Sequence, residues 1–134
     1  MLGYTGTFEG QPISVQTTGM GCPSAGIVFE ELAQLGARRF VRVGTCGGLL
    51  NGMQMGDIVI AMSATADDTT PLRYSGVDGF SPTATFGLIR SAADLAAADG
   101  STVHVGPIVT SGLFYDPDPT AFAKWKSTGH IGVE

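Results

Sequence analysis

Short runs rich in β-branched residues alternate along this chain with segments whose apolar residues recur at helical spacing. Strands are predicted at residues 3–8, 13–18, 37–43, 56–64, 101–110 and 130–134, and helices at residues 23–36, 82–100 and 120–129. The first two strands flank the sequence EGQP, which predicts a β-hairpin with Pro12 beside the turn. Helices interleaved with strands are typical of an α/β domain with a mainly parallel or mixed sheet. A chain of 134 residues is long enough for one such domain, so a single domain over residues 1–134 is expected.

The balance of apolar and charged residues indicates a globular protein with a sizeable core, since 43% of residues are apolar and 14% are charged. The net charge is -5, and the only cluster of basic residues is Arg38, Arg39 and Arg42. Binding to nucleic acid needs a basic stripe that neutralises phosphates, so this class of partner is excluded. No apolar run approaches the roughly 18 residues that cross a bilayer, and no export signal follows Met1. The sequence therefore predicts a soluble, cytoplasmic protein with no membrane partner.

Apolar residues at helical spacing define the face that each predicted helix buries. In the helix at 23–36, which Gly36 ends, that face comprises Ile27, Val28, Leu32 and Leu35. In the helix at 82–100, which Gly100 ends, it comprises Phe86, Ile89, Ala92, Leu95 and Ala96. In the helix at 120–129 the residues expected to face the core are Phe122 and Trp125. Residues 65–81 show no clear period and predict a long irregular connection.

The segment RVGTCGGLL, residues 42–50, joins the end of a predicted strand to a glycine-rich loop. Glycines let successive backbone N–H groups converge on one point, Thr45 adds a hydroxyl donor, and the Arg42 guanidinium suits phosphate oxygens. The segment therefore indicates either an anion site or a tight turn beside a surface arginine. It has neither the Gly-Lys-Ser/Thr of a P-loop nor the GxGxxG that opens a helix in dinucleotide-binding folds, so neither cofactor class is expected.

Three further segments follow predicted strands, namely GMGCPS at 19–24, SGLFYDPD at 111–118, and Glu134. Ligands of open α/β sheets bind beyond the carboxyl ends of strands, so these segments together predict a site at one sheet edge. Adjacent Phe114 and Tyr115 suit either stacking on a planar ring or ordinary loop packing. Met20 in the first of these segments suits either a ligand face or the core.

The remaining polar residues indicate little chemistry of their own. Asp116 and Asp118 flank Pro117 and have the positions of turn and N-cap residues. His104 and His130 have no cysteine, serine or carboxylate at an informative spacing, so both are interpreted as structural or exposed. The two cysteines form no CxxC pair, so neither a metal site nor a catalytic triad is predicted.

Taken together, these segments resemble the nucleoside phosphorylase family, which includes bacterial purine nucleoside phosphorylase and uridine phosphorylase. The resemblance covers nearly the whole chain, and its most specific parts are TGMGCPS at 18–24 and RVGTCG at 42–47. It implies a three-layer α/β/α fold around a mixed central sheet, assembled through dimers into hexamers. The implied reaction is phosphorolysis of a purine nucleoside to free base and (deoxy)ribose 1-phosphate, with inorganic phosphate as co-substrate and no cofactor.

The resemblance also implies roles for individual residues. Arg42, Gly44 and Thr45 match positions that hold phosphate, and Arg42 and Thr45 would act in catalysis. In the implied displacement at an oxocarbenium-like carbon, Arg42 would neutralise and position the attacking phosphate.

The nucleoside would be bound by a second set of positions that match the family. Met20 and Phe114 resemble residues that line the sugar, and Cys46 and Gly47 resemble those beside the base. Glu134 matches the first glutamate of the family's VEME run.

The chain also departs from the family pattern. An earlier strand with a glycine-arginine phosphate loop is missing, the sequence stops inside VEME, and Gly112 stands where many relatives have aspartate. These departures predict an incomplete fold, truncated at both ends. The isolated chain is then expected to be poorly stable and nearly inactive, because uncovered apolar faces and sheet edges favour aggregation.

Several alternatives remain open at this point. Within the family these are uridine and methylthioadenosine phosphorylases, because Thr45 also occurs in those branches. A nucleosidase would use water in place of phosphate, which Arg42 and Thr45 disfavour. The alternative from another class is a non-catalytic remnant that binds phosphate or nucleoside.

Overall fold

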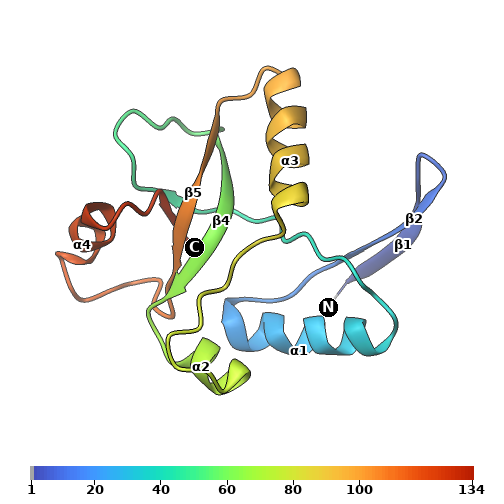
Figure 1. Cartoon of the computed structure of the whole chain (residues 1–134), viewed down its shortest axis with the longest axis horizontal. Helices are drawn as coiled ribbons and strands as arrows, with labels where there is room; N and C mark the ends of the chain where they lie inside the picture. The colour runs from blue at the N-terminus through green and yellow to red at the C-terminus, as the bar shows by residue number, and fades with distance from the viewer. Residues whose placement is uncertain (1) are drawn as a thin grey trace. The chain divides into compact units, whose positions relative to one another are not determined.

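The structure is a computed structural model that describes residues 2–134, and it consists of two compact units (Figure 1). The first unit ends at Arg42 and the second begins at Val43. The single domain expected over residues 1–134 stays a prediction.

The first unit begins with the predicted hairpin. β1 (Gly3–Phe8) pairs antiparallel with β2 (Gln11–Gln16), and Pro12 lies beside the turn as predicted. Glu9 and Gly10 of the turn have φ values of 48° and 77°. Positive φ at both central residues is the backbone that two-residue hairpin turns require, because it matches the twist of the strands.

The next element, α1 (Gly21–Gln34), begins slightly before the predicted start at Pro23. Val28 is buried and Leu32 is half-buried, as predicted for this face. The other two residues of the predicted face, Ile27 and Leu35, are 60% and 84% exposed. The buried stripe is therefore narrower than the apolar periodicity indicates.

The strand predicted at residues 37–43 is wrong, since none of these residues belongs to a strand in the described structure. The apolar run FVRV carried that prediction, but a strand forms only where a neighbour satisfies its backbone hydrogen bonds. Val41 is 73% exposed, whereas Phe40 packs its ring edge-to-face against Phe29 of α1 at 5.6 Å. The segment therefore makes side-chain contacts in place of a strand ladder.

A four-stranded sheet forms the centre of the second unit, and it is mixed, as predicted, although its strand at Gly47–Gly48 is predicted as a loop (Figure 1). Its strands, in spatial order, are β3 (Gly47–Gly48), β6 (Gly132–Val133), β5 (Val103–Thr110) and β4 (Ile58–Ala66). β5 is parallel to both β4 and β6, whereas β3 is antiparallel to β6. The carboxyl ends of β4, β5 and β6 therefore share one edge of the sheet.

The long connection from β4 to β5 carries two helices. α2 (Thr70–Ser75) lies where the sequence predicts irregular structure, and it ends at Gly76 with φ 70°. Its start is stabilised by Asp68, whose carboxylate accepts hydrogen bonds from the Thr70 N–H at 2.8 Å and hydroxyl at 2.9 Å. Hydrogen bonds of this kind are too local to produce a visible period in a six-residue helix.

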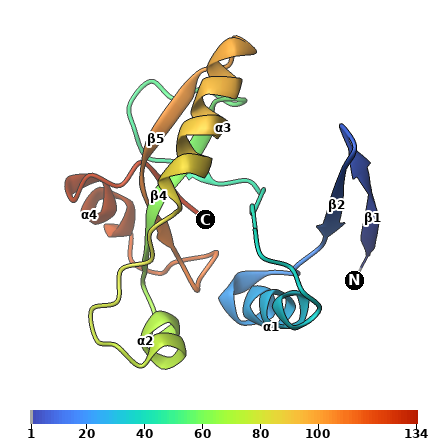
Figure 2. The ribbon, with the colours of Figure 1, turned by 45° about the vertical axis from the view of Figure 1, so that its right-hand side comes forward.

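The second helix of the connection, α3 (Phe86–Ala98), runs alongside β4 and β5 (Figure 2). It begins later than the predicted start at Pro82, because residues 82–84 pair with the outer edge of β4. The half-buried positions of α3 are Ile89, Ala93 and Ala96. The predicted stripe is wrong at the three positions that are exposed, namely Phe86, Ala92 and Leu95. Both stripes have helical spacing, so only contact with the sheet selects between them.

Glycines end α1 and α3 as predicted. Gly36 and Gly100 have φ values of 104° and 80°, in the left-handed region that disfavours side chains. The N–H groups of each glycine and its successor return to carbonyls of the last helical turn. This closes each helix in the usual glycine-terminated manner.

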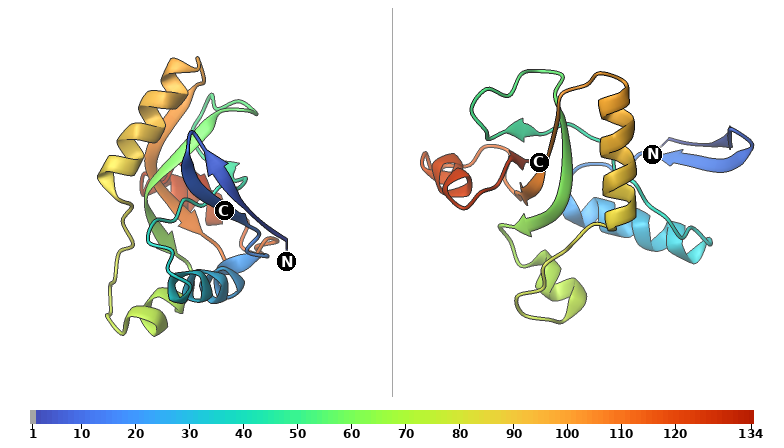
Figure 3. Two further views of the ribbon diagram at one scale, coloured as in Figure 1. Left: turned by 90° about the vertical axis from the view of Figure 1, so that its right-hand side faces the viewer. Right: turned by 45° about the horizontal axis from the view of Figure 1, so that its top comes forward.

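The third helix of the second unit, α4 (Ala121–Ser127), lies in the connection from β5 to β6 (Figure 3). Trp125 is half-buried as predicted, but Phe122 is 54% exposed, so its predicted position in the core is wrong. The two rings lie 5.4 Å apart, which leaves Phe122 on the outer side of Trp125. The buried core residues of this unit are Leu49, Val109, Ala121 and Ile131.

Candidate functional site

The site predicted at a sheet edge begins with the meeting of β3, β5 and β6. Gly47 of β3 lies opposite Val133 of β6, and extending this antiparallel register by one residue places Cys46 opposite Glu134. On the other side of β6, Val133 pairs with Val109 near the end of β5. The structure therefore brings Cys46, Gly47 and Glu134 to the same edge as the loop after β5.

Glu134 is held at this edge by the last residue of β5 and its successor. Its Oε1 atom accepts a hydrogen bond from the Thr110 hydroxyl at 3.0 Å. Its backbone carbonyl accepts one from the Ser111 N–H, also at 3.0 Å. The carboxylate and the start of the 111–115 loop are thus tied together.

A second carboxylate, Asp67, approaches the same loop from the end of β4. Its Oδ2 atom accepts a hydrogen bond from the Ser111 hydroxyl at 2.5 Å, and its Oδ1 atom accepts one from the Gly112 N–H at 2.9 Å. The Asp67 N–H in turn donates to the Thr110 carbonyl at 3.1 Å. Hydrogen bonds to an ionised carboxylate are stronger than those between neutral groups, so Asp67 anchors the base of the loop.

Gly112 occupies the position at which the family pattern predicts aspartate. A Cβ atom at this position would lie 3.8 Å from both Asp67 Oδ1 and Asp68 Oδ2, which is ordinary contact. An aspartate at this position would therefore add a third carboxylate beside two others. The departure from the family pattern coincides with this concentration of negative charge.

The aromatic pair of the loop faces solvent. Phe114 and Tyr115 are 92% and 88% exposed, and their rings meet edge-to-face at 5.0 Å. The sequence left open whether such neighbours pack one in and one out, and here both project outward. This leaves the faces of two rings available to a planar ligand.

The remaining predicted site residues divide between the two units. Gly44 and Thr45 lie in the second unit and are exposed, immediately before Cys46. Arg42 and Met20 belong to the first unit, where Met20 is 94% exposed and not part of a core. The roles of Arg42, Gly44, Thr45 and Met20 stay predictions.

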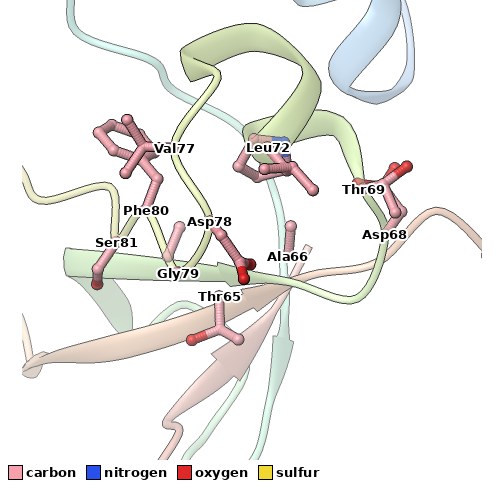
Figure 4. A pocket seen from close by; sticks show the side chains of 12 residues that line it. Thr65, Ala66, Asp68, Thr69, Leu72, Val77, Asp78, Gly79, Phe80 and Ser81 are labelled. Carbon is pink, nitrogen blue, oxygen red and sulfur yellow. The ribbon is translucent and has the colours of Figure 1, made fainter.

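A hollow of about 440 Å³ lies beside the end of β4, between that strand, α2 and the loop that follows α2 (Figure 4). Its lining includes Thr65, Leu72 and Phe80, and Figure 4 shows Asp78 extending from its loop toward β4. None of the residues that line it is a predicted site residue. Asp68 lines this hollow, whereas its neighbour Asp67 binds the 111–115 loop.

The opposite edge of the sheet carries a pair that the sequence analysis did not find. Asp57 precedes β4 and accepts a hydrogen bond at 2.9 Å from Nε2 of His104 on β5. Its side chain is 12% exposed and that of His104 23%, so His104 is structural, which is one of the two interpretations that the sequence leaves open. The Gln54 N–H and then His104 lower the pKa of Asp57 below its ordinary 3.8.

Among residues 2–134, no three His, Cys, Asp or Glu side chains gather closely enough to hold a metal ion. Within the same residues no helix has the length and apolar character that a membrane span needs.

Comparison with known proteins agrees with the resemblance found in the sequence. Residues 1–134 match the phosphorylase superfamily. The chain belongs to this superfamily. It is 45% identical to the DeoD-type purine nucleoside phosphorylase of Clostridium beijerinckii, and 42% identical to those of Clostridium novyi and Colwellia psychrerythraea. The matches cover 100% of this chain but 57%, 58% and 58% of the three relatives in turn.

The motifs of this superfamily member predict the loop and Glu134 as site residues, but they do not predict the residues that hold them. Thr110, Ser111 and Asp67 carry common side chains with no local motif. Thr110 lies 24 residues from Glu134, and Ser111 lies 44 residues from Asp67. Their one signal is position, since each follows or ends a strand whose carboxyl end reaches this edge.

Proposed function

We propose that this chain forms the nucleoside- and phosphate-binding part of a purine nucleoside phosphorylase. One observation carries the proposal: Cys46, Gly47, Glu134 and the loop with Phe114 share one sheet edge. The 42–45% identity to DeoD-type purine nucleoside phosphorylases supports the choice of a purine nucleoside.

In this proposal phosphate is held by the glycine-rich segment after Arg42. The Arg42 guanidinium and Thr45 hydroxyl donate to phosphate oxygens, and Gly44 lets the backbone approach the anion. Arg42 and Thr45 act in catalysis because they place the attacking oxygen and stabilise its charge. Inorganic phosphate is the co-substrate, and the reaction needs no cofactor.

The nucleoside occupies the neighbouring positions. By resemblance to the family, Phe114 and Met20 are each assigned to the sugar, and Cys46 and Gly47 to the base. Glu134 offers a carboxylate oriented by Thr110 to the sugar hydroxyls. The bond from sugar to base breaks as phosphate attacks the anomeric carbon, which yields free base and pentose 1-phosphate.

The assembled enzyme is a cytoplasmic homo-oligomer built from dimers. The exposed apolar side chains outside the site, such as Phe86 and Leu95 at 72% each, are compatible with burial in such an assembly.

The proposal is tested by calorimetric titration of the 134-residue chain with phosphate and with inosine, after circular dichroism has shown that it is folded. Binding of both ligands is expected, whereas any release of hypoxanthine is expected to be slow and to require phosphate, in keeping with the near-inactivity expected of the isolated chain. Uridine and methylthioadenosine in the same assay distinguish the alternative substrates. A folded chain that binds neither phosphate nor inosine would refute the proposal.

Replacement of Arg42 by alanine is the first mutational prediction. It removes charge-assisted hydrogen bonds worth about 1.5–3 kcal/mol, so phosphate affinity is expected to fall by about ten- to hundredfold. Arg39→Ala removes the same charge from an exposed neighbour and serves as the control. Equal phosphate affinity in the two variants, measured by calorimetry, would show that Arg42 does not hold phosphate.

A further inference from the structure

Phe114 depends on the backbone of its loop for its position. Its side chain is 92% exposed, and the ring contact it makes is with Tyr115, its neighbour in the same loop. A side chain in this situation has no packed surroundings that select its place. Whatever orders residues 111–113 therefore decides where the ring of Phe114 stands.

Three groups order those residues. The Glu134 carbonyl accepts the Ser111 N–H at 3.0 Å, and the Ser111 hydroxyl oxygen accepts the Leu113 N–H at 3.3 Å. The third group is the Asp67 carboxylate, which accepts both the Ser111 hydroxyl and the Gly112 N–H. Asp67 is the side chain that links this loop to β4, on the far side of β5 from Glu134.

We infer that Asp67 is a positioning residue for nucleoside binding, because its carboxylate fixes the loop that presents Phe114. The inference rests on the proposed function, since it assumes that Phe114 lines the sugar. Asp67 itself touches no substrate in this arrangement. It acts through Ser111 and Gly112 and therefore affects the nucleoside more than the phosphate.

The two carboxylates at this edge have separate tasks. Thr110 orients the Glu134 side chain, whereas the next residue, Ser111, gives its hydroxyl to Asp67. Loss of Asp67 leaves the Thr110–Glu134 bond and the β5–β6 pairing in place. The change is therefore expected to loosen the 111–115 loop without disturbing the sheet.

Asp67→Ala and Asp67→Asn test the inference. Alanine removes both carboxylate oxygens that accept hydrogen bonds from the loop. The exchange rate of the Gly112 amide hydrogen and the dissociation constant for inosine are therefore each expected to rise by about tenfold. The dissociation constant for phosphate stays unchanged. Asparagine keeps an acceptor for the Gly112 N–H and a group that can bond Ser111, so it is expected to retain most of the loop order.

Asp94→Ala, an exposed change on α3, is the matched control and leaves all three measurements unchanged. Ser111→Ala gives a second route to a loosened loop if Asp67→Ala does not fold. Unchanged Gly112 exchange in Asp67→Ala, or faster exchange without weaker inosine binding, would overturn the inference. A wild-type chain that binds neither ligand would refute the proposed function, and the exchange measurement would still decide whether Asp67 holds the loop.

Discussion

At the scale of single residues, two neighbouring hydroxyls at the end of β5 serve two carboxylates from different strands. Thr110 donates to Glu134 and Ser111 donates to Asp67. The sequence marks Glu134 because it belongs to a family motif, but it does not mark Asp67. Partners 44 residues apart leave no local pattern, so their contact had to be found in the structure.

Asp57 provides a prediction at this scale. Its folded-state pKa is lowered below 3.8 by the Gln54 N–H and by His104. The carboxylate therefore stabilises the fold above its unfolded-state pKa, and this contribution is lost as the pH falls through the lowered folded-state value. Asp57→Asn is expected to reduce stability near neutral pH and to flatten the fall in stability below about pH 4.

Urea unfolding of wild type and Asp57→Asn across this pH range measures the effect, with Asp94→Asn as the control. If the free energy of unfolding falls equally steeply with decreasing pH in wild type and Asp57→Asn, the Asp57–His104 pair does not contribute to stability.

At the scale of elements, the sequence correctly predicts where helices end and where the hairpin turns. It wrongly predicts a strand whose formation depends on a distant partner. Gly36 and Gly100 end their helices, and the turn at Glu9 and Gly10 closes the hairpin, because these effects act within a few residues. The strand predicted at 37–43 does not form, since an apolar run needs a paired strand that its own sequence does not contain.

The start of α4 offers a prediction about an element. The Asp118 carboxylate binds Lys124 Nζ at 2.6 Å, and it accepts the Thr120 N–H at 2.8 Å and hydroxyl at 2.6 Å. These bonds, that of Lys124 first, lower the pKa of Asp118. Asp118→Ala is expected to fray this short helix, because it removes the carboxylate that ties Thr120, just before the helix, to Lys124 within it.

Fluorescence of Trp125, the single tryptophan, reports the fraying as a red shift with a lower melting temperature. Asp118→Asn keeps an acceptor for Thr120 and is expected to lie between wild type and alanine. An unshifted spectrum and melting temperature in Asp118→Ala would contradict this role.

At the scale of the whole molecule, few of the described side chains are buried, and many large apolar side chains are exposed to solvent. Val109 is 1% exposed, whereas Leu95 of α3 and Phe86 at its start are both 72% exposed. Exposed apolar side chains favour association, as the sequence analysis expected. Stability and association should therefore respond to different substitutions.

Leu95→Lys is expected to reduce concentration-dependent association with a change in unfolding free energy of under about 0.5 kcal/mol. Val109→Ala is the matched core change and is expected to lose about 2–3 kcal/mol of stability, from lost burial and a cavity. Sedimentation velocity and urea unfolding of the two variants provide the comparison. A Leu95→Lys chain that associates as wild type does would show that this face is not involved.

The sequence by itself determined the α/β class, the order of most strands and helices, the glycine-ended helices and the family. These follow from periodicity and motifs, which act over a few residues. Only the tertiary structure decided which apolar stripe of α3 meets the sheet, that residues 37–43 do not pair, and that Asp67 and Glu134 meet one loop. The physical reason is that burial, strand pairing and carboxylate contacts depend on which distant segments become neighbours.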